Sequence, residues 1–264
     1  MIDIGISTAS LFLKTNVEDS FEIIEKLGCK VVEVFLTTFS EYKKEFAEIL
    51  KGRVKNVKVH SVHSLNNHYE PELFNASPRT QNDAEEIMRN VLNVGKEIGA
   101  EFYTFHGPAR LKNKPYNVNF PEFGKRVERL NDICKEYGIE LCYENVHWAY
   151  YYYPGFFKKL KDNSPNVKCT LDIKQAMQSG YDVYEYMDDM GDSIKTVHLC
   201  DVVDGKTCLP GTGKFDFCRF FEEILKRDVQ APQLLEVYSG DYQTYDDLAK
   251  SLDYLRDCLR KVIG

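Results

Sequence analysis

One repeated unit constrains the fold more than any other feature of this chain: an apolar, strand-like segment is followed by a loop and then by a helix-like segment. The strand-like segments are nearly continuous apolar runs, which is typical of parallel strands that are buried on both faces. Over 264 residues, eight units give about 33 residues each, a length that suits a βαβ repeat. We expect the strands at 2–7, 30–35, 57–63, 101–106, 139–144, 167–172, 194–199 and 232–238.

Helical periodicity marks the segments between these strands. Gly99 is placed to end one such helix, and residues 245–262 carry the pattern of a closing helix. Asn16 and Asp216 stand where helices are expected to begin, and both residue types are good N-caps. Units of this kind can form an open doubly wound sheet or a closed barrel. The count of eight favours the α/β class with a single (β/α)8 TIM barrel, as one domain over residues 1–264.

Six of the expected strands end in a side chain that can bind a metal ion. A parallel barrel brings the carboxyl ends of its strands together on one face, where active sites are built. Six candidate ligands at six equivalent places therefore predict one metal-centred site. These residues are His63, His106, Glu144, Asp172, His198 and Glu236.

The last four of these strand ends predict the metal ligands Glu144, Asp172, His198 and Glu236. Carboxylates with an imidazole suit one divalent ion such as Mn, Mg, Co or Zn. Such an ion can hold two neighbouring oxygens of a substrate, polarise a carbonyl and stabilise an enediolate. The carboxylates that bind it would lie beside the carbon whose proton moves, so they can also act as acid and base.

The two remaining strand-end histidines, His63 and His106, have two interpretations. They can form a second metal site that shares Glu144, or they can bind substrate and transfer protons as catalytic residues. His60 lies three residues before His63 on the same strand, so its side chain is expected to point to the other face.

Two loops next to the expected site carry further signals. Residues 145–157 hold Trp148 and several Tyr and Phe residues, which can roof the site and stack on a sugar, or can form a subunit contact. Residues 209–217, "LPGTGKFDF", can form a tight turn in which Asp216 caps the next helix, or can offer backbone amides to an anion.

Composition excludes several classes of function. The net charge of -7 argues against a protein that grips nucleic acid through clustered Lys and Arg. No apolar stretch approaches about 18 residues and no signal peptide is evident, so no membrane association is expected. Eight cysteines without paired spacing are typical of reduced thiols in a cytoplasmic protein. Barrel precedent and the aromatic loop suggest a homodimer or homotetramer.

With these residues in place, the chain resembles the sugar phosphate isomerase/epimerase family, which has the xylose isomerase-like TIM barrel and also includes endonuclease IV. The resemblance runs from the first strand to the last helix. The matching motifs are "SVHS" with His63, "TFHG" with His106, "CYEN" with Glu144 and Asn145, "TLDIKQA" with Asp172, "VHLCD" with His198 and Asp201, "LPGTGKFDF", and "LLEVY" with Glu236.

The resemblance implies roles for these positions. The common four-ligand site of the family falls on the four predicted metal ligands, and in its ketose epimerases the residues that match Glu144 and Glu236 also move the proton. In the endonuclease branch the residues that match His63 and His106 bind another zinc with the shared glutamate. Its third zinc needs a histidine where this chain has Gln175, and a further histidine that "DGKTCLP" lacks, so the nuclease interpretation loses a central part.

Gln175 also departs from many sugar enzymes, which carry a substrate-contacting histidine there; Gln cannot transfer protons at neutral pH. We expect a carbohydrate enzyme, an isomerase or epimerase of a small sugar, sugar phosphate or related polyol ketone. The alternatives are a dehydratase or lyase on a cyclic hydroxy-ketone acid, an endonuclease IV-like phosphodiesterase and a non-catalytic ligand-binding barrel. The residues expected to bind substrate are Asn145, Trp148, Lys174, Gln175 and Asp201.

Overall fold

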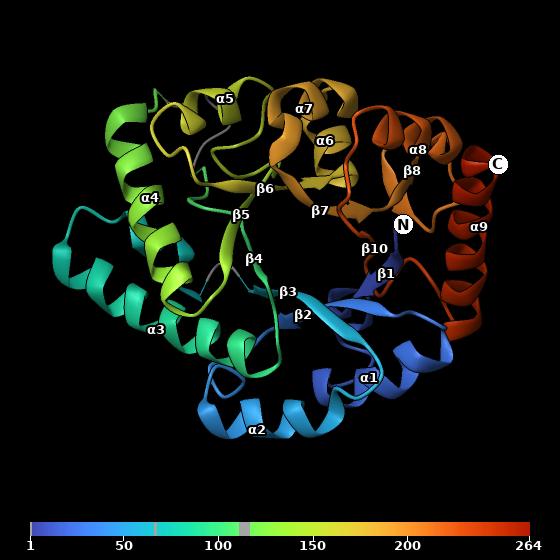
Figure 1. The fold of residues 1–264 in the computed structure, drawn as a ribbon, viewed down its shortest axis with the longest axis horizontal. Helices are drawn as coiled ribbons and strands as arrows, with labels where there is room; N and C mark the ends of the chain where they lie inside the picture. Colours follow the sequence, from blue (N-terminus) through green and yellow to red (C-terminus); the bar gives the residue numbers. More distant parts are fainter. Residues whose placement is uncertain (1, 66–67, 111–116) are drawn as a thin grey trace.

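The first and last strands of the central sheet pair with each other, and this pairing closes the sheet into a barrel of eight parallel strands (Figure 1). The computed structural model describes residues 2–65, 68–110 and 117–264. The barrel strands follow one another round the ring in chain order. They are β1 (Ile4–Ser7), β2 (Val31–Leu36), β3 (Lys58–Ser64), β4 (Phe102–Phe105), β5 (Glu140–Glu144), β6 (Lys168–Asp172), β7 (Ile194–Leu199) and β10 (Gln233–Leu235).

The predicted TIM barrel is therefore confirmed, and each of the eight predicted strands is present. Their ends differ by a few residues from the prediction. Strand β4 stops one residue before His106 and β10 stops one residue before Glu236, so these two side chains extend from the first loop positions. A short antiparallel hairpin, which the apolar pattern did not predict, follows β7. It consists of β8 (Asp201–Val203) and β9 (Lys206–Cys208).

Helices form the outer layer around the strands (Figure 1). The helix predicted to end at Gly99 does so, and Gly99 has the left-handed backbone (φ +81°) that such an end requires. Asp216 caps its helix by accepting a hydrogen bond from Arg219 N, whereas Asn16 occupies a cap position without a side-chain bond. The helices are η1 (Thr8–Leu11), α1 (Val17–Lys26), α2 (Lys44–Arg53), η3 (Glu70–Phe74), α3 (Pro78–Glu97), α4 (Phe120–Glu136), α5 (Phe156–Lys161), α6 (Ile173–Ser179), α7 (Val183–Met190), η4 (Gly191–Ser193), α8 (Phe217–Lys226) and α9 (Tyr245–Ile263).

The apolar core lies between the outer faces of the strands and the helices. Tyr143 of β5, for example, packs against Phe123 of α4 and Phe156 of α5. Because side chains alternate along a strand, the neighbouring Glu144 points into the barrel. None of the helices in the described ranges is long and apolar enough to cross a membrane.

Candidate metal centre and active site

Three predicted carboxylate ligands meet around an imidazole nitrogen of the fourth, His198, at the carboxyl ends of β5, β6, β7 and β10. Nδ1 of His198 lies 3.1 Å from Oε1 of Glu144 and 3.1 Å from Oε2 of Glu236. Oδ2 of Asp172 lies 3.8 Å from the same nitrogen. The four side chains come from positions far apart in the sequence, and the parallel register of the barrel brings them together.

The carboxylates of this cluster present oxygens that fit a divalent ion. Glu144 Oε2, Asp172 Oδ2 and Glu236 Oε2 are buried and have no hydrogen-bond partner among the described residues. Buried polar atoms without a partner cost free energy, so a cation would stabilise them. One ligand atom each from Glu144, Asp172 and His198 lies within 4.8 Å of the others. The donor set of carboxylates and imidazole therefore fits one ion of the kind predicted.

Burial and mutual charges shift the protonation of the cluster. Burial raises the pKa of Glu144 to about 7, although a hydrogen bond with His198 and the charge of His106 oppose it. Burial also disfavours ionised Asp172, but Lys174 and His198 outweigh it and lower the pKa of that carboxyl. Burial lowers the pKa of His198, yet the surrounding carboxylates, Glu236 first among them, raise it well above its usual value.

The side chain of Asn145 and the first turn of α6 hold Asp172 in place. Asn145, which follows Glu144, donates its side-chain NH2 to Asp172 O at 2.9 Å and accepts from Asp172 N at 2.8 Å. Asp172 Oδ1 caps α6 by accepting from Gln175 N at 2.7 Å. Asn145 was predicted to bind substrate, but its side-chain amide positions Asp172 instead. Because Oδ1 of Asp172 caps α6, only its Oδ2 faces the cluster.

The two other strand-end histidines lie beside this cluster. His106 Nε2 is 3.2 Å from Glu144 Oε2, and the rings of His63 and His106 have centroids 4.5 Å apart. One atom each from His63, His106 and Glu144 could hold an ion, since these atoms lie within 4.8 Å of one another. The predicted grouping of these two histidines with Glu144 is therefore present as geometry.

Lys174 lies inside the site rather than in solvent. Its ammonium nitrogen donates to Glu236 Oε1 at 3.1 Å and lies 3.6 Å from Asp172 Oδ2. Burial lowers the pKa of Lys174, but these two carboxylates raise it well above its usual value. Gln175 uses its side-chain oxygen to accept from Nδ1 of His147 at 2.6 Å and from the backbone N of the same residue at 3.2 Å.

A cavity of about 400 Å³ opens onto the cluster. Aromatic rings run along its wall, with Phe35 next to His63, and Trp148 next to His106 at a centroid distance of 5.3 Å. Of the aromatic loop 145–157, Trp148 lines this cavity, whereas Tyr151 and its neighbours Phe156 and Phe157 are fully buried against helices. The loop is therefore mostly core, and the prediction of an exposed aromatic contact surface is wrong for these three residues.

Asp201, also predicted to bind substrate, has other partners. Its carboxylate accepts backbone hydrogen bonds at 2.8–3.2 Å from Val202, Gly211, Gly213 and Phe215. A Cβ on Gly213 would lie 2.2 Å from Asp201 Oδ1, so only glycine allows this approach. The amides of the 209–217 turn, weighed above as an anion site, therefore hold an anion that the chain itself supplies.

Sequence reasoning missed two buried carboxylates beside the ligands. Glu33 of β2 lies with Oε1 3.0 Å from His198 Nε2, and Glu70 of η3 lies with Oε2 3.4 Å from His106 Nδ1. An acid within the apolar run "VVEVFL" was an available signal for Glu33, whereas nothing in its spacing marks Glu70. Burial raises the pKa of Glu33, but His198 outweighs burial and the net shift is downward.

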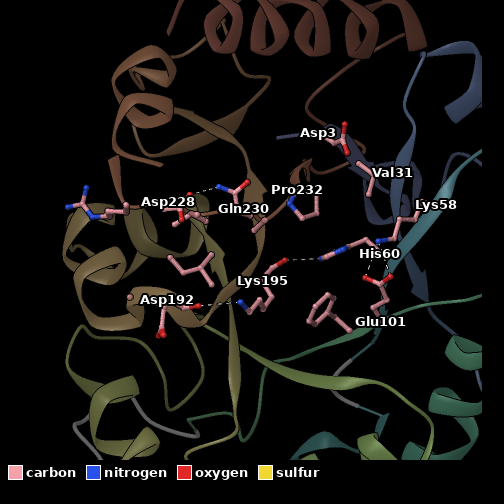
Figure 2. A pocket seen from close by; sticks show the side chains of 16 residues that line it. Asp3, Val31, Lys58, His60, Glu101, Asp192, Lys195, Asp228, Gln230 and Pro232 are labelled. Atoms are coloured by element: carbon pink, nitrogen blue, oxygen red, sulfur yellow. Dashed lines mark hydrogen bonds and ion pairs between the residues drawn. The ribbon is translucent and has the colours of Figure 1, made fainter. Parts of the chain in front are cut away.

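A second cavity, of about 550 Å³, lies at the opposite end of the barrel, where the strands begin (Figure 2). His60 lines this cavity, and its Nε2 lies 2.9 Å from Lys195 O on β7, so it reaches across the barrel instead of pointing to the outer face that was predicted for it. The nearby charges pair with one another, as Lys58 does with Glu101 at 2.9 Å. None of the predicted ligands lines this cavity, and this end of a TIM barrel serves stability rather than catalysis.

Comparison with known proteins places this geometry in a family. The family model described as xylose isomerase-like TIM barrel matches residues 21–258. An uncharacterised protein of Methanocaldococcus jannaschii is 25% identical over 269 residues, which cover 97% of this chain and 99% of that protein.

Solved structures share the fold along their whole length. D-psicose 3-epimerase with D-tagatose, from Clostridium cellulolyticum H10, superposes with a TM-score of 0.80 at 13% identity, covering 98% of this chain and 99% of that one. The IolI protein with a binding zinc atom has a TM-score of 0.75 at 16% identity, covering 99% and 98%. The match of the family model over most of the chain decides the assignment: this chain belongs to the xylose isomerase-like TIM barrel family.

Proposed function

We propose that this chain is a metal-dependent isomerase or epimerase of a small sugar, sugar phosphate or related polyol ketone. The observation that carries the proposal is the convergence of Glu144 and Glu236, each 3.1 Å from Nδ1 of His198, with Asp172 beside them. Two structural relatives support it, since one is a D-psicose 3-epimerase with D-tagatose and the other is the IolI protein with a binding zinc atom. The expectation of an enzyme agrees with these relatives.

The metal would be held by Glu144, Asp172, His198 and Glu236. When bound, a divalent ion supplies positive charge that polarises a substrate carbonyl and lowers the pKa of the neighbouring C–H. Asn145 would keep Asp172 oriented through its two backbone bonds. The carboxylates and the imidazole suit Mn, Mg, Co or Zn.

Glu144 and Glu236 would move the proton. Their strands, β5 and β10, are separated in the barrel by β6 and β7, so the two carboxylates approach a bound substrate from different sides. A base on one side and an acid on the other are what an epimerisation at carbon requires, since the proton leaves one face and returns on the other. Burial raises the pKa of Glu144 to about 7 in the metal-free protein, and the positive charge of a bound divalent ion would favour the ionised form that acts as a base.

His63 and His106 would hold substrate hydroxyls. Both rings line the cavity with Trp148, whose face can stack on the C–H face of a sugar and exclude water. A cavity of about 400 Å³ suits a small sugar rather than a polymer. Lys174 and Gln175 line the same space and would limit which substituents fit.

A second candidate, a phosphodiesterase, is favoured by one observation: His63, His106 and Glu144 can hold a second ion. Gln175 argues against this candidate. Its side-chain oxygen accepts hydrogen bonds from His147, and it stands where the endonuclease branch has a histidine that binds the third zinc. Two ions per chain, together with cleavage of an abasic-site duplex, would replace the epimerase proposal.

Solvent deuterium exchange tests the proposed function. The metal-loaded protein is incubated with a panel of ketoses in D₂O, and deuterium at the carbon next to the carbonyl is measured by NMR and mass spectrometry. We expect exchange that Glu144→Gln and Glu236→Gln abolish, and that Asp189→Asn, a buried acid on α7 far from the cavity, leaves in place. Loss of water from the product would indicate a dehydratase, and tight ligand binding without exchange would indicate a non-catalytic barrel.

A further inference from the structure

A buried carboxylate inside the barrel, Glu33, has no role in the proposal above. Its side chain has zero exposure, and no Lys or Arg pairs with it in the part of the chain that the structure describes. A carboxylate in such a place is costly to bury unless hydrogen-bond donors or a charged imidazole replace its hydration. A titratable residue that is buried at a cost in free energy is a candidate for a functional role.

Hydroxyl groups from three other strands hold this carboxylate. Ser7 of β1 donates to Oε1 at 3.1 Å. Ser61 of β3 and Thr104 of β4 donate to Oε2 at 2.8 Å and 2.6 Å. β1 and β3 flank β2 in the barrel wall and β4 lies next to β3, so hydroxyls from both sides of β2 hold the Glu33 carboxylate inside the barrel. The hydroxyls orient it so that Oε1 points across the barrel toward β7.

The imidazole of His198, on β7, lies where Oε1 of Glu33 points. Its Nε2 is 3.0 Å from Glu33 Oε1, while its Nδ1 faces Glu144, Glu236 and Asp172. Nε2 of His198 is buried, and its contact with Glu33 is not aligned as a hydrogen bond. Among the described residues it has no other hydrogen-bond acceptor.

We propose that Glu33 is a positioning residue that keeps the proton of His198 on Nε2 and so leaves the lone pair of Nδ1 facing the ligand cluster. An imidazole has one donor and one acceptor nitrogen when neutral, and a carboxylate at one nitrogen fixes the other as the ligand atom. Carboxylates placed in this way behind a metal-ligating histidine typically contribute 10- to 100-fold in metal affinity. This inference rests on the metal site of the proposed function and not on its substrate.

Metal affinity of the metal-stripped full chain tests the inference without any assay of turnover. Zn²⁺ and Mn²⁺ binding is measured by calorimetry with a competing chelator. We expect Glu33→Gln, which keeps the volume but puts an NH2 or a neutral oxygen at Nε2, to weaken binding by about 10- to 100-fold. Thr104→Val is the matched control: it removes a hydroxyl from the same carboxylate but leaves Oε1 next to His198, so affinity should change by less than about threefold.

A measurement on the unaltered protein covers the case in which Glu33→Gln does not fold. NMR of the histidine ring nitrogens in the Zn²⁺-loaded chain should show the proton of His198 on Nε2. A proton on Nδ1, unchanged affinity in Glu33→Gln, an equal loss in Thr104→Val, or no divalent binding at all would each overturn the inference. Metal binding that depends on Glu33, without ketose exchange, would support this inference and overturn only the proposed function.

Discussion

The ammonium nitrogen of Lys174 lies 3.1 Å from Oε1 of Glu236, so one predicted metal ligand is already paired with a cation from the chain itself. The same nitrogen is 3.6 Å from Oδ2 of Asp172, a second predicted ligand. Lys174 is 3% exposed, and its positive charge therefore acts with little screening by solvent. A divalent ion in this cluster would have to share two carboxylates with a fixed positive charge.

Replacement of Lys174 by methionine should strengthen metal binding. Removal of a positive charge from beside two ligands takes away repulsion of the ion, and we expect affinity to rise on the order of tenfold. Calorimetry on metal-stripped protein measures the change. Lys168→Met is the control, since that lysine pairs with Glu140 at 3.8 Å near the start of β6. Weaker binding in Lys174→Met would mean that the ammonium instead orders Glu236 for the ion.

The metal count should respond to Asp172 and not to His63. We expect about one divalent ion per chain, because four ligands with open positions suit one ion. Asp172→Asn should remove it, as measured by mass spectrometry on protein purified without chelator. His63→Ala should keep the count and lower turnover. Two ions, one of them lost in His63→Ala, would contradict this outcome and indicate a second site at His63, His106 and Glu144.

The raised pKa of Glu144 predicts a pH-dependent stability of the metal-free protein. The folded chain keeps a proton up to about pH 7 that the unfolded chain releases above 4.5. The contribution of this group is thus fully present below pH 4.5 and is lost as the pH rises through about 7. We expect the free energy of unfolding of the unaltered protein, minus that of Glu144→Gln, to fall across this window in urea titrations. A difference that does not vary with pH would show that the carboxyl titrates normally.

Glu70 should affect catalysis through His106. Its carboxylate accepts from Tyr103 Oη at 2.5 Å and from His106 N at 3.0 Å, which places Oε2 next to the imidazole. We expect Glu70→Gln to lower kcat by about 10- to 100-fold and to displace the pH profile, because the ring loses its charged partner. Tyr69→Phe removes a buried hydroxyl from the same network without touching Glu70, and should leave the pH profile in place. A shared effect of both variants would indicate a purely structural network.

Asp201 should matter for stability and not for substrate affinity. Asp201→Ala leaves four backbone amides without their acceptor, which we expect to cost roughly 2–4 kcal/mol of unfolding free energy. KM measured well below the melting temperature should stay unchanged. Asp204→Asn, at the exposed tip of the same hairpin where φ is +50°, keeps a residue type that tolerates this backbone and should alter neither quantity. A raised KM at full stability would restore the prediction that Asp201 binds substrate.

The sequence by itself determined the barrel and which side chains meet at the carboxyl ends of its strands. Parallel strands buried on both faces leave continuous apolar runs, and these runs identified the eight strands. In a closed barrel, a residue at the carboxyl end of any strand lies on the same face as the ends of all the other strands. For this reason Glu144, Asp172, His198 and Glu236 could be placed together before any coordinates.

Only the tertiary structure decided which hydrogen-bond and ion-pair partners these side chains have. Lys174 was expected to bind substrate, but its ammonium group is paired with two carboxylates, Glu236 and Asp172, that lie at the ends of different strands. Glu33 and Glu70 reach histidines on distant strands, and Asp201 turns toward the amides of its own loop. Spacing along a strand specifies the face on which a side chain lies, but contacts across a barrel depend on the packing of all eight strands, and that packing is a property of the whole chain.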